Sequence, residues 1–332
     1  MKIGIIGSGK FGLVLARIAL ENKNEVLIYS RRTSEVESIN KNNKSLSGFS
    51  FHDLAISATH NIDDLIECDA LFITVASKDF AESISKLNYR EFKGNYISCA
   101  KGFDKKSGML LTEVLLDKFN IPSKNIFVLS GPNLSVELGN QELTGTVISG
   151  EDSASVNALC AALKTDYFLP FSSNDRYGVE LGGVMKNIYA ILSGYFHKKG
   201  VGENTIGLLL TKCLSEMSIY SKARGADPRT FLGLAGVGDF FSTALSKESR
   251  NYRFGEFLAE GVTVEKALDK VGDTVEGYAT SLIVHQHAKK LKIKLKLLDY
   301  LISIYEKPKD ISEDKKIFKS LGIEADINFE FK

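Results

Sequence analysis

The sequence predicts a doubly wound α/β domain over residues 1–173, followed by an all-helical domain over residues 174–332. Three observations support this prediction. Short apolar runs alternate with longer amphipathic segments in the first half, which is typical of a mostly parallel sheet covered by helices. Strand patterns stop after about Asn174, and long helical stretches follow. The length of 332 residues also exceeds that of one ordinary single-core domain.

The expected strands of the first half are short apolar runs bounded by turn residues or charged segments. They cover residues 2–6, 25–29, 70–76, 95–99, 126–129, 144–148 and 167–171. Helical segments separate most of these strands. In residues 10–21 and 109–119, apolar side chains recur every three or four positions, so each segment is expected to form a helix with one buried face.

The second half is expected to consist of helices, because its apolar residues recur with helical spacing. The periodic segments cover residues 177–195, 204–224, 229–234, 252–260, 264–270, 278–291 and 295–305. Neither an internal repeat nor a low-complexity segment interrupts the pattern.

The composition excludes several classes of partner. The 42 basic and 41 acidic residues give a net charge of +1, too small for a global field that attracts nucleic acid or an anionic membrane. No apolar run approaches the roughly 18 residues of a membrane span, and no signal-peptide pattern is found. The four cysteines form no CxxC pair, which fits core residues in a reducing compartment. We therefore expect a cytoplasmic protein with neither a membrane span nor a nucleic-acid partner.

A glycine-rich turn follows the first expected strand. Gly7, Gly9 and Gly12 form a GxGxxG pattern that also contains Lys10 and Phe11. The first glycine permits a tight turn, the second lets a pyrophosphate approach the backbone, and the third allows the next helix to pack on the strand. A GxGxxG pattern alone could arise by chance, but its position between a strand and a helix predicts dinucleotide binding.

The second expected strand, residues 25–29, is followed directly by Ser30, Arg31 and Arg32. In NAD-preferring folds an acidic residue usually stands here and binds the ribose 2′-hydroxyl. Two guanidinium groups would suit a 2′-phosphate, because arginine binds phosphate oxygens through a planar fork. The alternative is that both arginines are solvated residues at the start of a helix.

Five further blocks carry a family resemblance. They are residues 99–102, with Lys101; residues 129–133, with Gly131 and Asn133; residues 178–187, with Lys186; residues 233–239, with Asp239; and residues 249–255. In this order they resemble the motifs of bacterial NAD(P)-dependent sn-glycerol-3-phosphate dehydrogenases over about residues 2–290. The resemblance implies a Rossmann-type domain and a helical domain of the 6-phosphogluconate dehydrogenase-like type. It also implies interconversion of dihydroxyacetone phosphate and sn-glycerol 3-phosphate, which feeds glycerophospholipid synthesis. A homodimer is a possible assembly.

The resemblance implies a catalytic role for three residues. Lys186 follows paired glycines on an expected helix and would be the acid/base, although a lysine on a helix is usually a solvated surface residue. Lys101 follows an expected strand at the carboxyl edge of the sheet and would lie between cofactor and substrate. Asp239 would hold a lysine and bind the substrate hydroxyl; its alternative role is a helix cap or turn residue.

Ser249, Arg250 and Asn251 supply a hydroxyl, a guanidinium and an amide in succession, a set of donors suited to a phosphate dianion. By resemblance they bind the substrate phosphate. The implied substrate-binding residues are Lys101, Gly131, Asn133, Lys186, Asp239, Thr243, Ser249, Arg250 and Asn251. The implied cofactor-binding residues, for NADP or NAD with NADPH preferred, are Gly7, Gly9, Lys10, Phe11, Gly12, Arg31, Arg32, Lys101, Ser135, Arg250 and Glu276.

Three positions depart from the usual family pattern. Phe11 replaces a Trp or Tyr, Asn133 precedes Leu134 where a small hydroxyl residue usually precedes Phe, and Arg32 stands where an acidic residue is frequent. The last of these favours the 2′-phosphate interpretation. The Asn133 change leaves a side-chain contact with the substrate in doubt.

Two other functions are compatible with the same architecture. A dehydrogenase for a 3-hydroxy acid or ketopantoate would bind a carboxylate, which does not call for the donor set of residues 249–251. A non-catalytic dinucleotide sensor would not need Lys101, Lys186 and Asp239 together. We expect no metal site, because His285 and His287 are two apart on an expected helix and cannot share one face.

Overall fold

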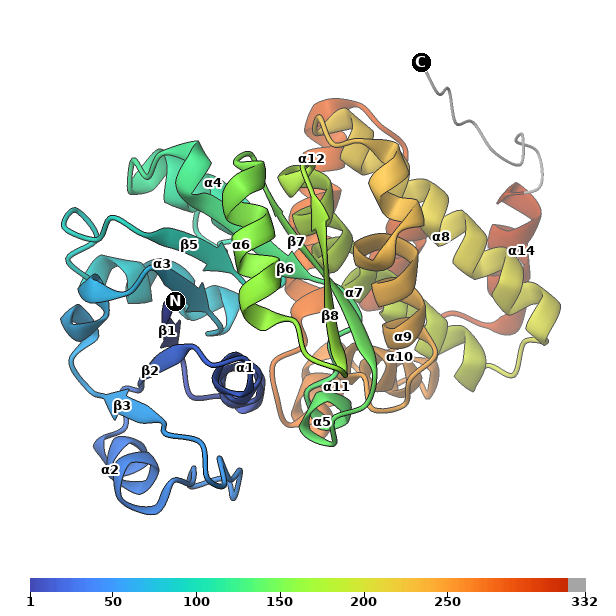
Figure 1. The fold of residues 1–332 in the computed structure, drawn as a ribbon. Helices are drawn as coiled ribbons and strands as arrows, with labels where there is room; N and C mark the ends of the chain where they lie inside the picture. Colours follow the sequence, from blue (N-terminus) through green and yellow to red (C-terminus); the bar gives the residue numbers. More distant parts are fainter. Residues whose placement is uncertain (322–332) are drawn as a thin grey trace. The chain divides into compact units, whose positions relative to one another are not determined.

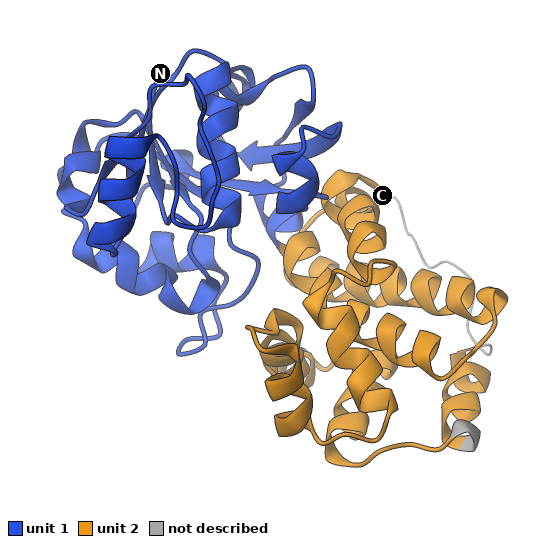
Figure 2. Ribbon diagram, turned by 90° about the horizontal axis from the view of Figure 1, so that it is seen from below, with its two compact units in different colours: residues 1–180 blue, residues 181–332 orange. Residues whose placement is uncertain are grey.

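The computed structural model describes residues 1–321. The chain divides into two compact units, residues 1–180 and the part that begins at Leu181 (Figures 1 and 2). The division falls inside helix α7 (Arg176–Lys198), close to the boundary expected between positions 173 and 174. The last part of the second expected domain, residues 322–332, lies outside the described residues.

Unit 1 contains an eight-stranded sheet in the spatial order β3-β2-β1-β4-β5-β6-β7-β8. The strands are β1 (Lys2–Ile6), β2 (Glu25–Tyr29), β3 (Ser57–Thr59), β4 (Ala70–Ile73), β5 (Asn95–Ser98), β6 (Ile126–Ser130), β7 (Thr144–Gly150) and β8 (Phe168–Ser173). Neighbouring strands are parallel except for β6 and β7. All seven expected strands form, and the sequence pattern missed β3, a three-residue strand at the sheet edge.

Both faces of this sheet are covered. Ile5 packs in one hydrophobic cluster with residues of α1 (Lys10–Glu21) and α6 (Ser153–Leu163), whereas the next residue, Ile6, packs in another with residues of α3 (Ser77–Lys86). Successive side chains of a strand point to opposite faces, so β1 has to be apolar on both. This arrangement confirms the predicted doubly wound fold (Figure 1).

The remaining helical segments of unit 1 are short. They are α2 (Thr33–Asn42), α4 (Leu111–Glu113), α5 (Ser135–Gly139), the 3-10 helices η1 (Ile62–Glu67) and η3 (Ser123–Asn125), and the π-helical turn η2 (Val114–Lys118). The prediction of one regular helix over residues 109–119 was therefore wrong in detail. Apolar spacing identified the buried side chains Leu111, Val114 and Leu115, but it does not distinguish α-helical from π-helical hydrogen bonding.

Unit 2 is helical over its described residues. Besides α7 it contains α8 (Glu203–Ala223), α9 (Asp239–Ala244), α10 (Arg250–Ala259), α11 (Val264–Val271), α12 (Glu276–Leu291), α13 (Lys296–Glu306), α14 (Ile311–Leu321), the 3-10 helix η4 (Pro228–Leu232) and the π-helical turn η5 (Leu234–Gly238). The sequence pattern missed α9 and α14. The expected helix over residues 229–234 forms instead as η4, which ends at Leu232 with Gly233 as its C-cap.

A buried carboxylate fixes the start of α13. Glu216 of α8 accepts hydrogen bonds from the amides of Leu297 and Leu298 at 2.7 and 3.1 Å and from the hydroxyl of Tyr189 at 2.9 Å. Burial raises the pKa of Glu216 to about 7, and the three donors act against that rise by stabilising the charged form. Glu216 thereby connects α8, α13 and α7.

None of the helices in residues 1–321 combines the length with the apolar character that crossing a bilayer requires.

Candidate active site

The glycine turn has the geometry that a dinucleotide phosphate needs. Gly7 has φ 115°, and its amide donates to the carbonyl of Tyr29 at 3.1 Å. A Cβ on Gly12 would lie 2.3 Å from the carbonyl oxygen of Gly7, so only glycine permits this packing of α1. A Cβ on Gly9 would meet no atom within 4 Å, and α1 has no side-chain cap. Open space in front of uncapped helix amides fits a pyrophosphate.

The loop after β2 lies against this turn. Ser30 Oγ lies 2.8 Å from Ser8 Oγ, and Arg31 and Arg32 follow. Arg31 pairs with Asp79 at 3.8 Å, and Arg32 pairs with the fully buried Glu35 at 3.4 Å. About 65% of the Arg31 side chain and 61% of the Arg32 side chain are exposed. Because a guanidinium has five donors, both keep donors for a further anion.

Lys101, Gly131 and Asn133 are brought together beyond the carboxyl ends of β5 and β6. Lys101 Nζ donates to the carbonyl of Gly131 at 2.8 Å, where a φ of 144° favours glycine. Asn133 Nδ2 donates to Thr146 Oγ1 at 3.0 Å, while its buried Oδ1 has no hydrogen-bond partner among the described residues. A buried acceptor without a donor is costly, so this oxygen is a candidate ligand contact.

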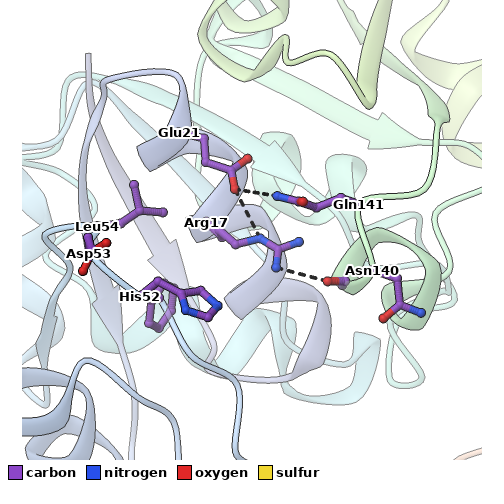
Figure 3. A pocket seen from close by; sticks show the side chains of 9 residues that line it. Arg17, Glu21, His52, Asp53, Leu54, Asn140 and Gln141 are labelled. Atoms are coloured by element: carbon purple, nitrogen blue, oxygen red, sulfur yellow. Dashed lines mark hydrogen bonds and ion pairs between the residues drawn. The ribbon is translucent and has the colours of Figure 1, made fainter.

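A buried arginine holds α5, the short helix that begins at Ser135. Arg17 of α1 donates to the carbonyls of Leu138 and Gly139 at 2.8 and 3.1 Å, and its Nε lies 3.6 Å from Glu21 (Figure 3). These carbonyls lie at the C-terminal end of α5, where a cation is favoured. Arg17, which lines the pocket in Figure 3, therefore anchors α5, and with it Ser135, against the helix that begins at the glycine turn.

Lys186 is the centre of a buried cluster in unit 2. It is only 6% exposed, and its Nζ donates to Asp239 Oδ1 and, at 2.7 Å, to Thr243 Oγ1. Lys186 belongs to α7, whereas Asp239 and Thr243 belong to α9. Breaking such a buried ion pair is expensive. The structure thus joins three residues that the sequence analysis predicted separately.

Glycines set the distance between α7 and the segments around it. A Cβ on Gly182 would lie 2.3 Å from the carbonyl oxygen of Ala235, just before α9. A Cβ on Gly255 of α10 would lie 2.0 Å from the carbonyl oxygen of Ile191, and one on Gly277 of α12 would lie 2.2 Å from that of Asn187. These contacts leave no space for side chains, so α9, α10 and α12 depend on them for their positions.

The segment 249–251 forms the start of α10. Ser249 caps the helix, with its Oγ accepting from the amide of Tyr252 at 3.3 Å. Asn251 donates to Asn187 Oδ1 at 2.9 Å and accepts from the amide of Gly277 at 2.9 Å. Glu276 is the first residue of α12. Sequence reasoning omitted Asn187 from the site, although it directly follows Lys186 in the motif.

An open helix N-terminus suits the phosphates of a dinucleotide, and a buried ammonium beside a carboxylate suits proton transfer. Together the two features are typical of nicotinamide-dependent dehydrogenases. The family follows from sequence comparison. Models of the NAD-dependent glycerol-3-phosphate dehydrogenase N-terminus and C-terminus match residues 2–156 and 175–314. The chain therefore belongs to the NAD-dependent glycerol-3-phosphate dehydrogenase family.

Individual relatives support the same family over nearly the whole chain. Identity to glycerol-3-phosphate dehydrogenase (NAD(P)+) of Pseudomonas savastanoi pv. phaseolicola is 33% over 330 residues, 98% of this chain and 96% of the relative. Identity to the enzyme of the same name from Alcanivorax borkumensis is 38% over 305 residues, 90% and 88% of the two chains. The solved glycerol-3-phosphate dehydrogenase from Coxiella burnetii has a TM-score of 0.84 at 27% identity, covering 97% of this chain and 99% of that one.

We predict that Gly182→Ala lowers both stability and turnover. The added Cβ would force apart α7 and the segment at Ala235, at a cost of about 1–3 kcal/mol, and would move Asp239 away from Lys186. The matched control is Gly207→Ala on α8, where a Cβ meets nothing within 4 Å and should stabilise the helix by about 0.5–1 kcal/mol. Denaturant unfolding measures the stability of each variant, and steady-state kinetics measure its turnover. A Gly182→Ala protein as stable and active as the unmodified one would contradict the packing argument.

Proposed function

We propose that this chain is an NAD(P)-dependent dehydrogenase that interconverts dihydroxyacetone phosphate and sn-glycerol 3-phosphate, and that it feeds glycerophospholipid synthesis. The observation that carries the proposal is the buried contact of Lys186 with Asp239 and Thr243, in a chain of the glycerol-3-phosphate dehydrogenase family. A small phosphorylated ketone is thus its substrate.

Lys186 acts as the general acid in this proposal. A bound nicotinamide cofactor supplies the hydride to the carbonyl carbon. Lys186 Nζ gives a proton to the carbonyl oxygen during reduction and takes it back from the hydroxyl in the reverse direction. Asp239 and Thr243 fix the position of Nζ, because both accept its hydrogen bonds. Lys101 contributes a second ammonium group and shares substrate binding with Gly131 and Asn133.

The substrate phosphate is assigned to Ser249, Arg250 and Asn251. They begin α10, so their side chains stand where the helix amides also favour an anion. Charge-assisted hydrogen bonds to a phosphate are about twice as strong as neutral ones. A ligand with a carboxylate in place of the phosphate would use fewer of these donors, which disfavours a 3-hydroxy acid or ketopantoate as substrate. The assembled Lys186 cluster likewise disfavours a sensor without catalysis.

The cofactor is assigned to the turn formed by Gly7, Gly9, Lys10, Phe11 and Gly12, with further contacts from Lys101, Ser135, Arg250 and Glu276. Arg31 and Arg32 stand in the place of the ribose-binding acid, and both guanidiniums are mostly exposed. We therefore propose that NADPH is preferred over NADH. The ion pairs with Asp79 and Glu35 hold the two arginines at the end of β2.

We also propose that the protein works in the cytoplasm and assembles as a homodimer. Four free cysteines fit a reducing compartment.

The reaction itself is tested by comparing two ketones. We expect oxidation of NADPH with dihydroxyacetone phosphate to exceed that with dihydroxyacetone by at least about 10²-fold in kcat/KM, because the second ketone loses several charge-assisted hydrogen bonds. Absorbance of the reduced nicotinamide gives both rates. Equal rates with the two ketones would contradict the assignment of the phosphate site.

The cofactor preference is tested by replacing Arg31 and Arg32 together with alanine. The KM for NADPH should rise more than the KM for NADH, because only NADPH carries the 2′-phosphate that the guanidiniums bind. Lys41→Ala, an exposed change on the following helix, controls for the loss of positive charge. An equal rise of the KM for NADPH and the KM for NADH in the double variant would show that the arginines do not bind the 2′-phosphate.

The proton donor is tested by Lys186→Ala. Turnover at saturating substrate and cofactor should fall by at least about 10²-fold, whereas cofactor affinity should change little. Lys186→Arg should fail to restore turnover, because a guanidinium holds its proton too tightly at neutral pH.

Removing Lys186 leaves Asp239 buried without its cation, so melting temperatures and circular dichroism of each variant must establish that it is folded. Near-normal turnover of folded Lys186→Ala would assign the acid/base role to Lys101 or to a bound water.

A further inference from the structure

Arg250, one of the proposed phosphate-binding residues, is already paired with an acidic side chain of its own chain. Its Nη1 lies 2.7 Å from Oδ2 of Asp273, in the loop between α11 and α12. Oδ1 of Asp273 accepts from the amide of Thr274 at 2.6 Å, which orients the carboxylate. About 43% of the Arg250 side chain and 62% of the Asp273 side chain are exposed, so solutes can reach the pair.

The start of α12, which directly follows this loop, contacts the start of α10 at a second point. The amide of Gly277 donates to Asn251 Oδ1 at 2.9 Å, so residues 273–277 touch two consecutive members of the phosphate-binding segment. Gly277 also packs directly on the backbone of Asn187. These contacts hold the loop near α10 independently of the ion pair, and Asp273 therefore stays close when Arg250 binds something else.

An anion is favoured at this place for two reasons. Arg250 offers a planar fork of donors, and the first turn of the ten-residue α10 carries the partial positive charge of a helix N-terminus. In this structure the carboxylate of Asp273 provides the anion. A phosphate dianion needs the same donors, so the two anions compete.

We propose that Asp273 is a specificity-determining residue that competes with the substrate phosphate for Arg250 and lowers the affinity for phosphorylated ketones. This inference rests on the proposed function, because it takes Arg250 as a phosphate donor. An exposed ion pair contributes little to stability, so the main effect of Asp273 is on the bound anion. In a water-like medium, one charge a few ångströms from a dianion changes its affinity by about 3- to 30-fold.

The experiment measures the KM for dihydroxyacetone phosphate at saturating NADPH and the inhibition constant of inorganic phosphate in Asp273→Asn. Both should fall by about 3- to 30-fold, and the fall should shrink at high ionic strength because salt screens the repulsion. Asp269→Asn removes an equal charge from an exposed position of α11 and should change neither constant. Asp273→Glu retains the charge and should leave both constants within about twofold of the unmodified protein.

Unchanged constants in Asp273→Asn, or an equal fall in Asp269→Asn, would overturn the inference. A fall confined to the KM for NADPH would also overturn it, since the competition would then concern a cofactor phosphate.

Arg250→Met separates the inference from the proposed function. If this variant leaves the KM for dihydroxyacetone phosphate unchanged, the phosphate-binding role of Arg250 fails. If it raises the KM while Asp273→Asn has no effect, only the competition fails. In the double variant, Asp273→Asn should give no gain, because the competition needs the guanidinium.

Discussion

The site in unit 2 depends on how closely other backbone segments approach α7. A buried lysine–aspartate pair is stable only when its geometry offsets the loss of hydration. That geometry requires Asp239 to start a helix beside Lys186, which the contact at Gly182 allows. The contact at Gly277 likewise holds the start of α12, where the amide of Gly277 donates to Asn251. One helix therefore sets the positions of the Lys186 cluster and of residues 249–251, to which we assign acid/base catalysis and phosphate binding.

Every arginine that is proposed to bind an anion has an acidic partner in its own chain. Arg31 pairs with Asp79, Arg32 with Glu35, and Arg250 with Asp273. Such partners orient long side chains and keep the net charge near neutral, in agreement with the overall charge of +1. They also oppose phosphate binding, so the affinity for an anion reflects a competition as well as the number of donors.

Much of the fold could be predicted because its signals are local. The buried strand β1 and the amphipathic helix α1 form with the bounds that apolar periodicity gave. The errors occur where that signal is weak or ambiguous. Three-residue β3 is too short to show alternation, and the spacing of apolar residues in 109–119 fits α-helical and π-helical turns equally. The helix α9, with six residues, is similarly too short to be periodic.

The sequence by itself determined the fold class, the glycine turn and the candidate residues, because strand and helix periodicity, glycine spacing and motif order are properties of the linear chain. It did not determine which candidates meet. Lys186 and Asp239 are 53 positions apart, and their contact depends on backbone packing at Gly182. The pairing of Arg250 with Asp273 was likewise decided by the tertiary structure, because an ion pair between distant positions depends on the path of the loop and leaves no periodic pattern in the sequence.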